Sequence, residues 1–204
     1  PVSNLFWYFL NPFIIIELTG NLHFEGVMLF FLILSMYLLI KQHLIGSAVF
    51  YGMSISVKLI PLMLLPLLFS YFTGGLKNCF KRRNSAKNYK AVFFYYVITG
   101  LVIMLCFIPY TTGDFIDNYS NTIGLWFTNF EFNASIYYLA RGFGFLMTGY
   151  NEIAIIGKFL PLITMGVIGY FTFFRNLKDT KSLIASMLFV ISLNIIRRLL
   201  SKKY

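Results

Sequence analysis

The chain has 204 residues, of which 58% are hydrophobic and 12% are charged, and its formal net charge is +10. Soluble domains carry about 25% charged residues, and a soluble fold has too much surface to hide this much apolar side chain. The composition excludes an ordinary soluble domain and predicts an all-α, multi-pass integral membrane protein. The positive charge lies in short clusters between apolar runs, a pattern typical of membrane loops, which argues against nucleic acid as a partner.

Seven apolar segments are predicted to form membrane or half-membrane helices, since a spanning helix needs about 20 apolar residues. In chain order they are residues 4–18, 24–41, 44–58, 61–73, 91–109, 152–174 and 182–200. The first segment contains Pro12. The third and fourth belong to one long apolar run, which Lys58, Pro61 and Pro66 interrupt. We expect the segments to form a single transmembrane domain over the whole chain.

Charge indicates how the long apolar run crosses the membrane. The basic loops at residues 74–90 and 175–181 should be cytoplasmic, because Lys and Arg favour that side. Lys41 shares that side only if the run crosses twice, so we expect a hairpin with residues 58–61 at its outer tip. The basic end of the last helix, residues 197–203, does not fit this plan.

Two stretches are expected on the outer face: the loop at residues 19–25 and the longer segment at residues 110–151. The longer segment alternates polar and aromatic residues, which predicts short helices lying in the membrane interface. It contains Arg141, one helical turn after Tyr137 and Tyr138. This arginine suits a phosphate or an ion pair with Glu131, and it is equally compatible with an ordinary interfacial position.

The first outer loop gathers four polar groups between two apolar helices. They are Glu17, Asn21, His23 and Glu25. Ionisable groups at membrane depth are costly and mark functional sites by default, and a carboxylate near an imidazole can do general base work. The alternative is an ordinary polar, solvent-exposed loop between two helices. Composition does not choose between a functional site and such a loop. One histidine and two carboxylates without a ligand repeat do not indicate a metal site.

Lys58 is the second candidate, because burying a lysine in an apolar run is costly, and such a residue usually has a functional role or extends to the interface. Pro61 interrupts the helix ladder close to it and frees backbone groups. A cation beside an interrupted helix at the bilayer boundary can hold a lipid phosphate. The alternative, which composition favours, is a side chain that extends to the interface without a ligand.

Two stretches together resemble a known family. Residues 11–26 read NPFIIIELTGNLHFEG, and residues 54–66 read SISVKLIPLMLLP. The first resembles a stretch of polyprenol-dependent glycosyltransferases of the GT-C fold, in which Asn-Pro, an apolar run, Glu, Gly-Asn, His or Gln and an acid open a helix. The second resembles their signature of lysine, two residues, proline, an apolar run and proline. The order and spacing are most similar to bacterial mannosyltransferase-like membrane enzymes.

The resemblance implies an enzyme that takes a sugar, often mannose, from a polyprenyl-phosphate carrier. It would transfer the sugar to a lipid-linked or cell-envelope acceptor on the outer face of a bacterial inner membrane. A carboxylate would act as base on the acceptor hydroxyl, and the lipid phosphate would leave. In this family the principal catalytic carboxylate lies in the first outer loop. We therefore expect it upstream of Pro1, and we expect this chain to be an N-terminally truncated fragment that is inactive alone.

The resemblance also implies roles for the candidate residues. Lys58, with motif support, and Arg141, without it, would hold the donor phosphate. Four residues would line the sugar or acceptor pocket: Glu17, Asn21, His23 and Glu25. No cofactor is expected beyond the lipid-linked donor. Two rival interpretations remain: a transporter or flippase for a lipid-linked sugar, which broken helices and intramembrane cations also suit, and a non-catalytic membrane subunit.

Overall fold

The computed structural model describes residues 3–20, 23–75, 85–129, 142, 145–146, 149 and 165–199. These residues form helices and turns, and no strand occurs among them, so the helical part of the fold prediction is confirmed there. The chain divides into two compact units. The first contains Pro1–Met63 and Phe93–Pro109, and the second contains Leu64–Val92 and Tyr110–Tyr204. The single transmembrane domain expected from the sequence stays a prediction.

Three short helices open the first unit. They are α1 (Ser3–Phe9), α2 (Pro12–Ile15) and the π-helix η1 (Ile16–Gly20). Pro12 is the first residue of α2, where its fixed φ and its missing N–H suit a helix start. The expected segment 4–18 is therefore not one continuous helix, because the chain breaks immediately before this proline.

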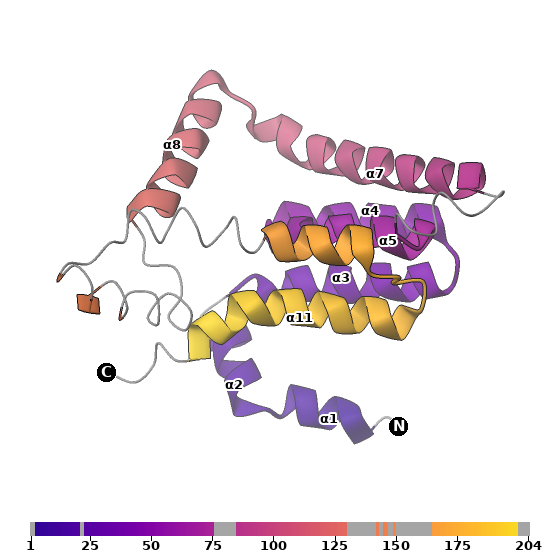
Figure 1. The fold of residues 1–204 in the computed structure, drawn as a ribbon. Helices are drawn as coiled ribbons and strands as arrows, with labels where there is room; N and C mark the ends of the chain where they lie inside the picture. The colour runs from indigo at the N-terminus through magenta and orange to yellow at the C-terminus, as the bar shows by residue number, and fades with distance from the viewer. Residues whose placement is uncertain are drawn as a thin grey trace. The chain divides into compact units, whose positions relative to one another are not determined.

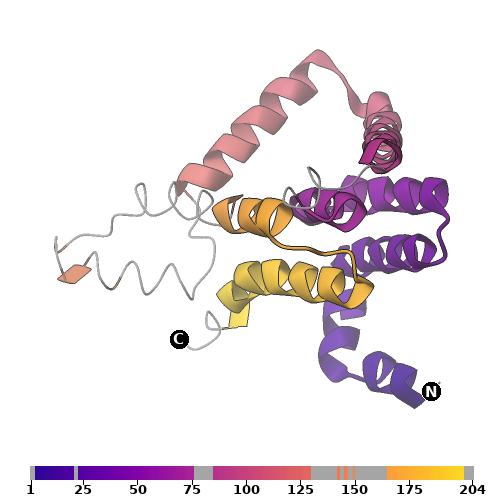
Figure 2. The same cartoon turned by 45° about the vertical axis from the view of Figure 1, so that its right-hand side comes forward.

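Helices α3 (Glu25–Ile40) and α4 (Leu44–Val57) form an antiparallel pair (Figures 1 and 2). Residues 41–43 join them, and Gln42 takes a left-handed conformation with φ 64° that turns the chain back. The Gln42 amide donates to the Leu39 carbonyl at 3.0 Å and closes the end of α3. The helices have 16 and 14 residues, or about 24 and 21 Å at 1.5 Å per residue. The start of α3 and the end of α4 therefore lie at the same level.

Hydrogen bonds from serine side chains connect α3 to α4. The Ser35 hydroxyl donates to the Ser47 carbonyl at 2.7 Å, and the Ser54 hydroxyl donates to the Met28 carbonyl at 2.8 Å. All three serines are buried. Small side chains that bond across two apolar helices allow the backbones to approach closely, which is typical of helix pairs in membranes.

The second half of α7 (Ser85–Phe107) packs on α4 in the same unit. The Thr99 hydroxyl donates to the Ala48 carbonyl at 3.3 Å. Gly52 permits this approach, because a Cβ there would lie 2.9 Å from the Val102 Cβ and 3.0 Å from the Thr99 carbonyl oxygen. Helices α3 and α4 and the second half of α7 thus form the packed apolar core of the first unit.

Only one helix among the described residues, Tyr89–Tyr110, is long and apolar enough to cross a membrane. It comprises most of α7 and the 3-10 turn Ile108–Tyr110. Just 17% of its most apolar window is buried, whereas the core helix of a soluble protein is mostly buried, so this helix supports a membrane protein. The other apolar helices have 10–17 residues, and seven membrane spans are therefore not confirmed.

The long apolar run is interrupted where the sequence places Lys58 and Pro61. Helix α4 ends at Val57, and Lys58 is extended, with φ −156° and ψ 136°. The 3-10 helix η2 (Ile60–Leu64) and then α5 (Leu65–Thr73) follow. The break in the run is thus confirmed, while the proposed double crossing of the membrane stays a prediction.

The second unit packs α5 against α11 (Thr180–Leu199) and the helix Met165–Phe174. The rings of Phe69 and Phe173 meet with their centroids 6.1 Å apart. Phe69 is half-buried and Phe173 is exposed.

Helix α8 (Gly113–Asn129) also belongs to the second unit. Its sequence separates apolar from polar residues around the helix, and the rings of Phe115 and Tyr119 stack at 5.5 Å. A helix was expected in residues 110–151, and α8 is one. Its place in a membrane interface stays a prediction, and Arg141 lies outside the described residues.

Candidate functional site

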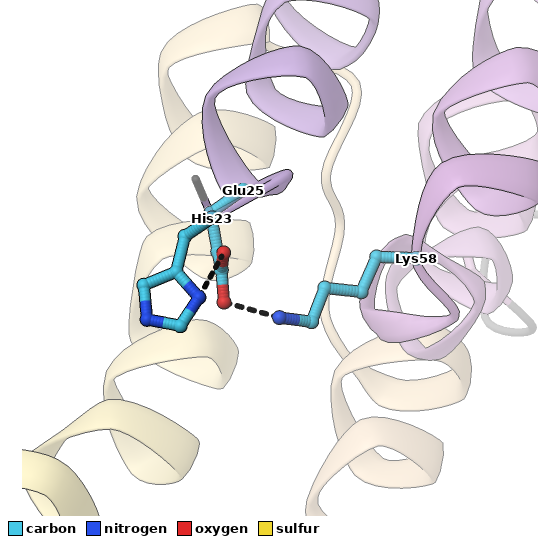
Figure 3. A network of polar contacts seen from close by, with 3 residues as sticks. All are labelled: His23, Glu25 and Lys58. Atoms are coloured by element: carbon cyan, nitrogen blue, oxygen red, sulfur yellow. Dashed lines mark hydrogen bonds and ion pairs between the residues drawn. The ribbon is translucent and has the colours of Figure 1, made fainter. Parts of the chain in front are cut away.

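Three of the expected site residues meet at one end of the α3–α4 pair (Figure 3). The Lys58 ammonium donates a hydrogen bond to Glu25 Oε1 and forms an ion pair with this carboxylate. His23 Nδ1 lies 3.7 Å from Glu25 Oε2. The side chains of His23, Lys58 and Glu25 are 49%, 36% and 21% exposed, so a ligand can reach the two that can carry positive charge. These three residues are called the Lys58 cluster below.

The helices themselves place the Lys58 cluster. Glu25 is the first residue of α3, and Lys58 directly follows the last residue of α4. A carboxylate at a helix N-terminus and an ammonium at a helix C-terminus each gain about 0.3–1 kcal/mol from the helix dipole. Because α3 and α4 are antiparallel and similar in length, these two favourable positions are neighbours. The ion pair thus closes the open end of the pair, opposite the turn at residues 41–43.

At the proline break next to Lys58, the Pro61 carbonyl has an internal hydrogen-bond partner. The Tyr51 hydroxyl donates to the Pro61 carbonyl at 2.9 Å, and Tyr51 is fully buried. A carbonyl beside an interrupted helix would otherwise lack an internal partner. Tyr51 was not singled out from the sequence, although it lies ten residues, or about three helical turns, before Pro61.

The π-helix η1 lies close to the start of α3. A Cβ at Gly26 would lie 2.5 Å from Leu18 Cδ2, so this glycine leaves room for the leucine side chain. The backbone of Glu17 belongs to η1, and π-helical turns occur frequently at functional sites. The Glu17 side chain and the whole of Asn21 lie outside the described residues, as Arg141 does.

The electrostatics of the Lys58 cluster favour a charged carboxylate. Glu25 belongs to the loop end of α3 and lies outside the spanning helix Tyr89–Tyr110. Partial burial raises the pKa of Glu25, whereas the hydrogen bond and the positive charge of Lys58 lower it. The lowering effects together are larger, so this pKa lies below its ordinary value. At neutral pH the cluster therefore contains a carboxylate that is held by an ammonium.

The three side chains offer complementary chemistry. A carboxylate accepts hydrogen bonds from hydroxyl groups, an ammonium donates to phosphate oxygens, and an imidazole can do either. Within the described part of the chain, no group of three or more His, Cys, Asp and Glu residues is placed to hold a metal ion. The cluster is thus suited to a ligand that carries both hydroxyl groups and negative charge.

A comparison with protein families identifies a similar domain. Residues 1–74 match the family model described as alpha-(1->6)-mannopyranosyltransferase, N-terminal domain. The match covers 74 of the 204 residues and includes the entire Lys58 cluster. It supports the resemblance to mannosyltransferases, because residues 11–26 and 54–66 both lie inside it. No curated protein and no solved structure matches the chain.

Proposed function

We propose that this chain is part of a multi-pass membrane glycosyltransferase of the GT-C fold. The enzyme transfers mannose from a polyprenyl-phosphate donor to a lipid-linked or cell-envelope acceptor on the non-cytoplasmic face of a bacterial inner membrane. The observation that carries the proposal is that the whole Lys58 cluster lies inside the stretch similar to a mannosyltransferase domain. The exposed apolar surface of the helix Tyr89–Tyr110 supports the membrane location.

Lys58 has the features required for binding the phosphate of such a donor. It lies beside an interrupted helix, its side chain is partly exposed, and its flexible stem carries three N–H donors. As the sugar leaves, negative charge grows on the departing phosphate, and a fixed cation next to that charge lowers the barrier. Lys58 therefore stabilises the leaving group.

Glu25 and His23 have the features required on the sugar side of the site. Carboxylate and imidazole groups bind the hydroxyl groups of a sugar or acceptor and fix their orientation. We assign Glu17 and Asn21 to the same pocket and Arg141 to the phosphate. The chemistry requires a lipid-linked donor and no separate cofactor.

The test is a transfer assay on membranes that contain the full-length protein. Polyprenyl-phosphate mannose with a labelled sugar is added, and the envelope lipids are extracted and separated. The expected result is a labelled mannolipid that membranes lacking the protein do not produce. Absence of transfer to any envelope lipid would contradict the proposal.

The transporter alternative rests on the same broken helix, because interrupted helices also build transport sites. A second arm of the assay separates the two. Liposomes carrying the protein receive the labelled donor in one leaflet. Movement of intact donor to the other leaflet without cleavage would support a flippase, and cleavage of the sugar–phosphate bond supports the transferase.

A further inference from the structure

We infer that Glu25 is a competing counterion for Lys58, which pairs with the ammonium and weakens the retention of the phosphate product. The inference rests on the proposed function and adds a control of release at the same site. It starts from the ion pair of Figure 3, in which the ammonium expected to bind phosphate is already bound to a carboxylate.

A phosphate that binds Lys58 must compete with this carboxylate. Two anions around one ammonium share its donors and repel each other, and the repulsion is strong in a partly buried site where water screens poorly. The Glu25 side chain is 21% exposed, so its charge is only partly screened. Binding of any phosphate at Lys58 is therefore weaker than it would be beside a neutral residue.

Lys58 is able to change partners without disturbing the helices. Its backbone is extended and follows the end of α4, so no turn of α4 needs to unwind. The stem of a lysine is flexible, and its end can move several ångströms by rotamer changes. When the ammonium moves to a phosphate, Glu25 keeps His23 at 3.7 Å from its second oxygen and gains the freedom to accept a sugar hydroxyl.

Glu25 discriminates between donor and product by charge. A sugar linked to polyprenyl phosphate is a phosphodiester with one negative charge. After transfer the lipid is a phosphomonoester, which carries about −1.5 to −2 at pH 7. The carboxylate thus repels the product more strongly than the donor, which favours release of the product after each turnover.

The inference predicts that removing the charge of Glu25 tightens binding of the product. In nanodiscs that contain the full-length protein, Glu25→Gln should bind polyprenyl phosphate about tenfold more tightly than wild type, a usual size for a coupling between two ligands. Polyprenyl-phosphate mannose should gain less. An increase in affinity cannot result from misfolding, so the test does not depend on equal stability of the variants.

Four controls make the measurement specific. Lys58→Gln should weaken binding of polyprenyl phosphate, and the double variant Glu25→Gln/Lys58→Gln should show no gain over Lys58→Gln. Lys41→Gln, at an exposed lysine just after the other end of α3, should bind as wild type does. Inorganic phosphate should follow the same order at lower affinity, which separates the charged group from the lipid tail.

The possible outcomes separate the two proposals. Affinity for polyprenyl phosphate that is unchanged, reduced or undetectable in Glu25→Gln overturns the counterion role, as does a gain that persists without Lys58. If the affinity shifts as expected while no sugar is transferred, the counterion role stands and the proposed transferase fails. If the protein transfers sugar but Glu25→Gln does not tighten binding, only the counterion role fails.

Discussion

In the proposed function, Lys58 is the residue on which the chemistry depends most directly. Replacing it with Ala in the full-length enzyme should reduce the rate of sugar transfer about tenfold or more, because the charge that develops on the departing phosphate loses its cation. The measurement is initial rate with labelled polyprenyl-phosphate mannose. Lys41→Ala is the matched control, since it removes an exposed lysine from the other end of the α3–α4 pair. Wild-type turnover in Lys58→Ala would remove this residue from the site.

Tyr51 supports the chain break next to Lys58. Tyr51→Phe leaves the ring in place but removes the hydroxyl that donates to the Pro61 carbonyl, and this buried acceptor loses its partner. The free energy of unfolding should fall by about 1–2 kcal/mol. Chemical unfolding in detergent measures it, with Tyr37→Phe, on the exposed side of α3, as the control. An unchanged stability would show that the carbonyl finds another partner.

At this scale the sequence located candidates but not their contacts. His23, Glu25 and Lys58 were all identified from motifs and from the cost of charge in apolar segments. The direct pairing of Glu25 with Lys58 was not predicted, because 33 residues separate them and the motif assigns the lysine to a phosphate. The expected segments 24–41 and 44–58 nearly coincide with α3 and α4, so pairing them as antiparallel helices of similar length would have placed Glu25 near Lys58.

Among the helices, the approach of α7 to α4 depends on Gly52. Gly52→Ala would drive a Cβ into the Val102 side chain and the Thr99 carbonyl, so the free energy of unfolding should fall by about 1–3 kcal/mol. Gly100→Ala is the matched control within α7, because nothing lies within 4 Å of its Cβ position and alanine favours a helix. Both are compared by unfolding in detergent. Equal stability of the two variants would contradict the close packing at Gly52.

Some boundaries of the helices can be predicted from the sequence alone, and others cannot. Pro61 and Lys58 predicted the break after α4, because proline removes a backbone donor and a lysine resists burial. Pro12 was noted, yet the first segment was still drawn as one span, although proline favours a new helix start. The serine contacts of α3 with α4 were missed, since serines occur in many apolar helices and only their pairing in space distinguishes these.

For the whole molecule, sidedness is the property that the proposed function needs and that charge patterning alone predicts. After Cys79 and Cys106 are replaced, single cysteines are introduced at His23 and at Lys181, which are both exposed. A membrane-impermeant thiol reagent should label His23→Cys in intact cells and Lys181→Cys only in permeabilised cells. Labelling of both positions, or of Lys181→Cys alone, in intact cells would contradict the assigned orientation.

The similar lengths of α3 and α4 bring Glu25 and Lys58 together, and this limits insertions and deletions in the two helices. One codon inserted within α4 would rotate Lys58 by about 100° around the helix axis and shift it by about 1.5 Å, which would carry the ammonium away from Glu25. The same holds for a single deletion in α3. Insertions and deletions within α3 or α4 should therefore be rare among functional homologues.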